Sequence, residues 1–263
     1  MLFQIFFITS IAGIAGTGIG AVLGTLFCRD SVKITGLLVS FAAGIMLSVV
    51  CFNMISDALL PENAGKQMSI FLVNTGIALG FCMVWGLNGW IQKYFPNPEL
   101  MMAGVVMILA IAIHNLPEGM IIGASFAADT AKFAADAAKG AAEMAIQRNA
   151  SSGLILAVVI GIHNIPEGMA VAVALVNGGI SSPKAILAAA GSGIPTVLGA
   201  LLGWKLGTLG PVMLCLMLSF AAGAMLYVVM GELIPEALQM WKSRVIAASI
   251  LMGMLTGMVI IFS

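Results

Sequence analysis

The chain carries little charge and almost no histidine. Lys, Arg, Asp and Glu together make up 8% of its 263 residues, and only two residues are histidine, whereas about a quarter of the residues in a typical soluble domain are charged. The 11 basic and 11 acidic residues balance, which argues against a basic surface for nucleic acid and an acidic tail for a soluble partner. With 61% hydrophobic residues, the composition excludes an ordinary soluble domain and indicates a polytopic membrane protein.

Paired cysteines and nucleotide-binding motifs are also absent. Four cysteines, Cys28, Cys51, Cys82 and Cys215, lie singly in or beside apolar segments. Their spacing fits neither a thiolate metal site nor a redox pair. Without a phosphate-binding motif, ATP-driven chemistry has no support in the sequence.

Long apolar runs dominate what remains. Windows of about 20 apolar residues predict an all-α fold of eight transmembrane helices. Their approximate ranges are 2–27, 34–59, 68–93, 100–123, 153–176, 183–206, 211–236 and 245–262. We interpret residues 1–263 as one transmembrane domain, with three helices in 1–99, a central pair in 100–176 and three helices in 177–263. Lysine and arginine in the short loops favour both termini outside.

The one long connection, residues 124–152, is rich in alanine. Asp129, Asp136 and Glu143 recur every seven residues, with Lys132 and Lys139 between them at the same period. This spacing predicts an extramembrane helix with a charged, solvated face. A regulatory metal-binding loop would be expected to carry histidine, and this connection has none.

An internal repeat relates the two ends of the chain. Phe41–Leu59 returns as Phe220–Leu238 with eleven of nineteen positions identical, at an offset of 179 residues. The same offset maps helix one onto helix six. Because an odd number of crossings separates the copies, they run in opposite directions. We therefore predict a 3+2+3 inverted repeat, an arrangement found in secondary transporters with a site near the bilayer midplane.

The two central helices share a polar motif that holds both histidines. Residues 113–120 and 162–169 match at seven of eight positions, giving His114-Asn115-Leu116-Pro117-Glu118-Gly119 and His163-Asn164-Ile165-Pro166-Glu167-Gly168. Residues four apart stack on one helix face, so each helix presents an imidazole and a carboxylate together. The antiparallel pair places both motifs at similar depth, which predicts one shared site.

Ionisable residues at this depth are costly and usually serve a function. Each proline removes a helical donor and leaves the carbonyl of Ile113 or Ile162 in need of a partner. Imidazole, carboxylate and amide ligands suit zinc, iron or manganese better than copper(I) or calcium. The alternative is a neutral polar cluster that holds two helices together, but two copies at matched depth favour the metal site.

These motifs resemble the ZIP (Zrt/Irt-like) family of divalent metal transporters, in its bacterial, GufA-like branch. The resemblance covers the eight spans, the two HNxPEG motifs and the FAAGxM phrases of helices two and seven. It implies a two-ion metal centre built from the six polar motif residues, with Met46 as a further contact. It also implies a homodimer in a bacterial inner membrane, and an elevator-like movement of helices one, four, five and six against the others. The six residues are His114, Asn115, Glu118, His163, Asn164 and Glu167.

The sequence departs from the family pattern at two places. His163-Asn164 stands where many relatives carry glutamine and aspartate, and Thr196 stands where many carry a glutamate. Both changes remove negative charge from the second metal position. Asn53 and Asp57 in helix two correspond by repeat to Glu232 and Glu236 in helix seven. We interpret these four as transport-path residues, with interfacial anchors as the alternative, and we assign Thr196 to the same path.

The predicted function is therefore uptake of a divalent transition metal, zinc first, into the cytoplasm by alternating access. Zn²⁺, Fe²⁺, Mn²⁺ or Cd²⁺ would be the transported substrate, and no cofactor is expected. A metal-dependent intramembrane hydrolase is the main alternative, although the chain has no HExxH motif and its symmetric motifs offer no distinct base. A structural or signalling protein with a fixed metal is a third hypothesis.

Overall fold

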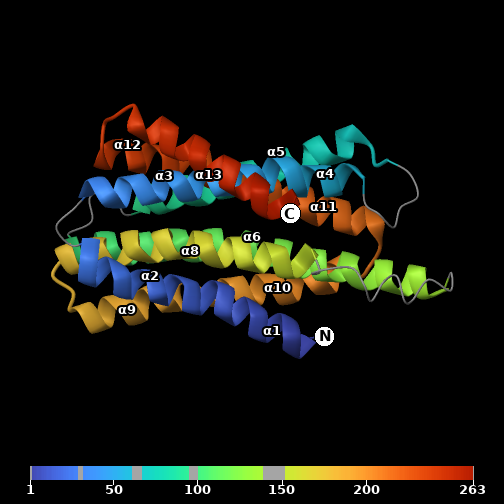
Figure 1. The fold of residues 1–263 in the computed structure, drawn as a ribbon, viewed down its shortest axis with the longest axis horizontal. Helices are drawn as coiled ribbons and strands as arrows, with labels where there is room; N and C mark the ends of the chain where they lie inside the picture. Colours follow the sequence, from blue (N-terminus) through green and yellow to red (C-terminus); the bar gives the residue numbers. More distant parts are fainter. Residues whose placement is uncertain (1, 29–31, 61–66, 95–99, 139–151, 263) are drawn as a thin grey trace.

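The protein is a bundle of long helices lying nearly parallel to one another (Figure 1). The computed structural model describes residues 2–28, 32–60, 67–94, 100–138 and 152–262, and within these ranges it contains no strand. The elements in chain order are α1 Leu2–Ser10, η1 Ile11–Ala15, α2 Gly16–Leu23, η2 Gly24–Cys28, α3 Val32–Ser48, η3 Val49–Met54, α4 Ile55–Leu59, α5 Ile70–Tyr94, α6 Leu100–Ala138, α8 Ser152–Asn177, α9 Ser182–Gly191, α10 Ile194–Gly207, α11 Pro211–Tyr227, η4 Val228–Leu233, α12 Ile234–Met240 and α13 Val245–Phe262. The η elements are π-helical.

The predicted spans are helical. Among the described residues, seven segments are long and apolar enough to cross a membrane, namely Leu2–Leu26, Lys33–Leu59, Ile70–Trp90, Ser152–Val176, Ser182–Gly207, Pro211–Met240 and Val245–Phe262. The predicted fourth span lies in α6, whose first turns have side chains outside the described residues. The all-α membrane fold is thus confirmed.

The connection predicted to begin at Ala124 starts inside α6, which continues without interruption to Ala138. A helix was predicted here, and its position outside the membrane stays a prediction. Ala124 and Phe126 are both buried. The first turn of α8 packs against Phe126, since a Cβ added to Gly153 would meet its ring, whereas Ala124 lies beside Gly207 of α10. The charged side chains predicted at 132, 136, 139 and 143 lie outside the described residues.

Asp129 connects the two central helices beyond this contact. Its carboxylate oxygens accept hydrogen bonds from the backbone N–H groups of Ser152, at 3.3 Å, and Gly153, at 3.0 Å. These N–H groups belong to the first turn of α8, where no helical partner exists. Asp129 therefore caps α8 from the neighbouring helix.

The helices form two layers (Figure 1). We call residues 2–28, 100–138 and 152–207 the motif bundle, since it contains both HNxPEG motifs. Residues 32–60, 67–94 and 211–262 form the companion bundle. The two bundles meet chiefly where α6 lies against α11 and where α8 lies against α3.

Within each bundle, glycines bring helix backbones into direct contact. A Cβ added to Gly20 would collide with the carbonyl of Ile165, and one added to Gly199 with that of Leu116. In the companion bundle, Gly44 lies in the same way against Ile250. Small residues permit such close crossings in membranes, where dispersion contacts drive helix association. Further crossings of this kind occur at Gly80, Gly119, Gly123, Gly168, Gly203, Gly223 and Gly253, each within one bundle.

The π-helical segments η3 and η4 occupy equivalent positions in the repeat. Val49 corresponds to Val228 and Met54 to Leu233, so both segments begin and end at matching residues. Segments of this kind widen the helix by one residue and often mark functional sites. Here each follows a FAAGxM phrase and carries a polar residue in its fifth place, Asn53 or Glu232.

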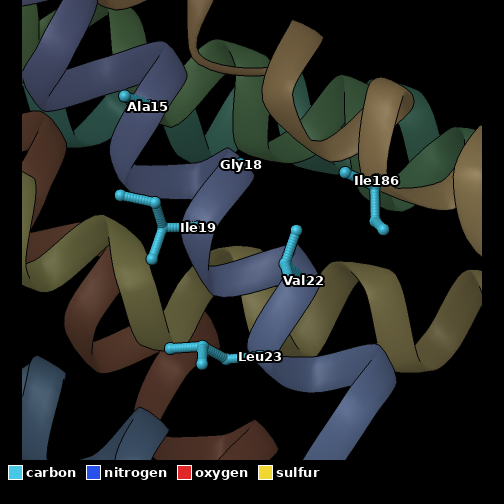
Figure 2. A pocket seen from close by; sticks show the side chains of 6 residues that line it. All are labelled: Ala15, Gly18, Ile19, Val22, Leu23 and Ile186. Carbon is cyan, nitrogen blue, oxygen red and sulfur yellow. The ribbon is translucent and has the colours of Figure 1, made fainter.

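An apolar groove runs along the outside of the motif bundle between α2 and α9 (Figure 2). Its volume is about 380 Å³. Because its side chains offer no oxygen, nitrogen or sulfur and Ile19 is 53% exposed, we assign this surface to lipid contact and not to metal binding. The lining residues are Ala15, Gly18, Ile19, Val22, Leu23 and Ile186.

Candidate metal site

Three predicted ligands form one buried cluster between the central helices. Glu118 lies on α6, and His163 and Glu167 lie on α8; each is at most 5% exposed. Both helices continue through their motif prolines, Pro117 and Pro166. One ligand atom from each of the three side chains lies within 4.8 Å of the others. The prediction that two sequence-distant motifs meet is thus confirmed for these residues.

The spacing of the cluster suits a single ion. Zinc holds nitrogen and oxygen ligands at about 2.0–2.2 Å, so two ligands of one tetrahedral ion lie roughly 3.3–3.6 Å apart. His163 Nε2 lies 3.6 Å from Glu118 Oε1, within that range and too long for a hydrogen bond. Both could therefore coordinate the same ion after small side-chain adjustments.

The polar atoms of the motif are short of partners. Both carboxylate oxygens of Glu118 are buried and form no hydrogen bond with the described residues, and the same holds for the Oδ1 atoms of Asn115 and Asn164. Burying such groups without compensation costs free energy. A cation among these oxygens would supply the missing partner.

The two asparagines also contact other helices. Asn115 Nδ2 donates to the carbonyl of Ser192 at 2.7 Å, and Asn164 Nδ2 donates to the carbonyl of Ala12 at 3.0 Å. The sequence indicated the amides as ligands but did not indicate these two acceptors. The glycines around Ser192 could have signalled a helix break there, whereas no residue pattern marks Ala12.

The remaining predicted ligands differ in what the structure says of them. His114 lies in α6, four residues before Glu118, but its side chain is outside the described residues. Met46 is 2% exposed and belongs to the apolar core shared with Ala12. Thr196 is fully buried against Gly13, and its hydroxyl forms no hydrogen bond with the described residues.

Of the predicted path residues, Thr196 lies in the motif bundle and the other four lie in the companion bundle. Glu232 accepts a 2.7 Å hydrogen bond from Asn88, whose Nδ2 also lies 2.9 Å from the Tyr227 hydroxyl. Glu232 is thus held within its own bundle, between α5 and η4. Asn53 has a buried Oδ1 without a hydrogen bond to the described residues.

Asp57 and Glu236 stand near the ends of their spans. Both are half-buried, and both have interaction partners. Neither belongs to the cluster of Glu118, His163 and Glu167. Their role as path residues or interfacial anchors stays a prediction.

Comparison with known proteins agrees with the repeated motifs. Over 268 residues the chain is 31% identical to the zinc transporter ZupT of Chlorobium limicola, an alignment that covers 94% of this chain and 92% of that protein. The chain belongs to the ZIP family. The family model described as ZIP zinc transporter matches residues 141–263, which include the second HNxPEG motif.

Other relatives of this ZIP protein align over similar lengths. The ZupT zinc transporter of Streptococcus mutans is 29% identical over 277 residues, covering 97% of this chain and 95% of the relative. That of Escherichia coli is 29% identical over 260 residues, covering 94% and 91%. These proteins are named as transporters, not as enzymes. The predicted family is confirmed, whereas assignment to the GufA-like branch stays a prediction.

Proposed function

We propose that the protein takes up divalent transition metal ions, zinc first, through the cluster of Glu118, His163 and Glu167. The observation that carries this proposal is the buried pair of Glu118 oxygens without a hydrogen-bond partner among the described residues, set beside a second carboxylate and an imidazole. Burying a carboxylate within a membrane span costs free energy, and binding of a cation would offset that cost. Relatives at 29% and 31% identity are named zinc transporters.

The ligand set suits a borderline divalent ion. Imidazole and carboxylate together fit zinc, iron, manganese and cadmium. His114 is one helical turn before Glu118, on the same face of α6, and we assign it as a fourth ligand. Two carboxylates balance one divalent charge, while Thr196 and Asn164 add none, so we propose one firmly held ion at this position.

Alternating access is supported by how the two bundles pack. Glycine crossings join helices inside each bundle, and the core shared by the two bundles is built from apolar side chains. Apolar side-chain contacts can slide more readily than backbones held together through glycine. We propose that the motif bundle moves as a rigid body against the companion bundle and carries the ion with it.

The inverted repeat explains how such a movement can have two comparable end states. α2 packs on the second motif in α8 through Gly20 and Ile165. α10 packs on the first motif in α6 through Gly199 and Leu116. Gly20 and Gly199 are 179 residues apart, the offset of the repeat, and the two carbonyls occupy matching motif positions. These paired contacts support a two-fold relation between the halves.

The remaining features of the proposal come from the family. Five residues would line the route between water and the site, namely Asn53, Asp57, Thr196, Glu232 and Glu236. Met46 would contact the ion. We propose a homodimer in a bacterial inner membrane with both termini outside. Light scattering of the purified detergent complex would measure the oligomeric state. Labelling of single cysteines introduced near each end would show on which side of the membrane the termini lie.

Uptake of radioactive zinc into proteoliposomes tests the function. The wild-type protein should accumulate zinc above protein-free vesicles, whereas Glu118→Ala and His163→Ala should not. Asn74→Ala, at an exposed position of α5, is the control and should transport normally. Tight zinc binding without flux in either direction would contradict the proposal and favour a fixed metal.

A further inference from the structure

We infer that Asn115 and Asn164 are positioning residues for the two helices that carry the metal ligands. The side-chain nitrogen of Asn115 attaches the junction of α9 and α10 to α6, and that of Asn164 attaches η1 to α8. Both side chains are fully buried. Asn115 Nδ2 reaches Ser192 O, and Asn164 Nδ2 reaches Ala12 O. The role differs from that of a ligand, since it uses the nitrogen and not the oxygen of each amide.

The acceptor of Asn115, the Ser192 carbonyl, lies at the break between α9 and α10. The run of helical hydrogen bonds is interrupted between α9 and α10, at Ser192 and Gly193. The N–H of Thr196, which would bond to Ser192 O in a regular α-helix, bonds instead to Gly193 O at 3.2 Å. Asn115 therefore supplies a donor to a carbonyl that its own helix does not use in the α-helical way.

The acceptor of Asn164, the Ala12 carbonyl, lies in the π-helical segment η1. The N–H of Gly16, which would bond to Ala12 O in an α-helix, bonds instead to the carbonyls of Gly13 and Ile11. The Ala12 carbonyl thus loses its ordinary partner, as Ser192 does. A carbonyl oxygen can accept two hydrogen bonds, and Asn164 Nδ2 supplies one of them to Ala12 O.

The two attachments are related by the internal repeat to within one residue. Asn115 and Asn164 are the second residues of the two motifs, and an offset of 179 carries Gly13, the neighbour of Ala12, onto Ser192. Two different distortions, a π-helical segment and a helix break, therefore present a carbonyl at nearly the same place. A recurrence on both sides of the site indicates a shared role.

In this chain the arrangement favours asparagine at both positions. An asparagine can donate to a carbonyl and still offer Oδ1 to the site, whereas an aspartate can only accept. An aspartate at either position would face the carbonyl oxygen with negative charge. The inference rests on the proposed function only where zinc affinity is concerned, because the helix contact exists without metal.

Hydrogen exchange of the metal-free protein tests the attachment. Asn164→Asp should speed amide exchange in residues 11–17 and leave residues 192–197 unchanged, while Asn115→Asp should do the reverse. Zinc affinity should fall by roughly three- to twentyfold in each variant, the effect of one interhelical hydrogen bond in a membrane. Asn74→Asp introduces the same change at an exposed position of α5 and should alter neither segment.

The crossed pattern separates positioning from the other roles. Unchanged exchange with equal or tighter zinc binding would overturn the inference, since an aspartate is the better ligand. Faster exchange in both segments for either variant would also overturn it, because that indicates general loosening. If the aspartate variants do not fold, Asn115→Ser and Asn164→Ser remove most of the contact without charge and should give the same crossed pattern. Zinc uptake by wild type is measured separately, so failure of transport would not be mistaken for failure of the attachment.

Discussion

The motif bundle and the companion bundle are built by the same packing but differ in chemistry. Each contains helices from both halves of the repeat, and each closes its crossings through glycine, as at Gly20 in one and Gly44 in the other. Only the motif bundle holds a cluster of metal-ligating side chains among the described residues. Shared packing therefore accounts for the fold, and the function depends on a few buried polar residues of one bundle.

Polar residues of the companion bundle have a different character. Asn88 of α5 is hydrogen-bonded to Tyr227 of α11 and to Glu232 of η4, and all three side chains are partly buried. Glu118 is 1% exposed, and neither of its carboxylate oxygens has a hydrogen bond to the described residues. The comparison suggests that a satisfied carboxylate stabilises a bundle, while an unsatisfied one is available for a cation.

The largest expected effect contrasts the two carboxylates. Glu118→Gln removes charge from the cluster, and loss of one member of a buried charged pair costs about 3–5 kcal/mol. We expect zinc affinity in detergent to fall by at least about 100-fold. The same change at Glu232 should alter equilibrium affinity less than about threefold, since this residue lies in the other bundle. Equal losses at both positions in a calorimetric titration would remove the distinction between the bundles.

The next effect tests the packing that the bundles share. Gly199→Ala and Gly44→Ala would each push a Cβ into a neighbouring carbonyl, so we expect a loss of about 1–3 kcal/mol of stability, as for overpacking in a core. Thermal unfolding of the detergent-solubilised protein measures it.

Gly86→Ala and Gly89→Ala are the matched controls for this prediction. Both glycines lie in helix α5, and a Cβ added to either would meet no atom within 4 Å. Alanine should there be neutral or stabilising by up to about 1 kcal/mol. If all four variants unfold alike, glycine serves these helices in some way other than close contact.

A smaller effect concerns the motif bundle alone. Asp129→Ala removes the acceptor for the N–H groups of Ser152 and Gly153, and loss of a helix N-cap costs about 0.5–2 kcal/mol. Hydrogen exchange should quicken in the first turn of α8 while zinc affinity changes little. A large loss of affinity would instead place Asp129 in the metal chemistry.

The smallest effect concerns the companion bundle alone. Asn88→Ala removes the hydrogen bonds from α5 to Tyr227 of α11 and Glu232 of η4. Each such bond contributes about 0.6 kcal/mol on average in membranes. The unfolding temperature should fall slightly and zinc affinity should stay constant. Reduced zinc uptake at constant stability would show that the Glu232 cluster belongs to the transport path.

The sequence predicts those parts of the molecule that depend on composition and periodicity. The last span, 245–262, matches α13, and the meeting of Glu118 with His163 follows from the motif spacing and antiparallel helices. The continuation of α6 beyond Ala124 agrees with the helix predicted for the connection, whereas the contact between Phe126 and Gly153 depends on packing that the alanine-rich pattern does not indicate. Nothing in local hydropathy indicates that η3 and η4 are π-helical, or that Ala12 and Ser192 present carbonyls to the site, since these depend on contacts between distant residues.

The central claim is that the two motifs form one transport site and not two. Initial rates of zinc uptake in proteoliposomes by Glu118→Ala, Glu167→Ala and the double variant test it most directly. One shared site predicts that either single change abolishes uptake and that the double variant is no worse. Two independent sites would leave roughly half of the wild-type rate in each single variant, with loss only in the double variant, and that result would contradict the account.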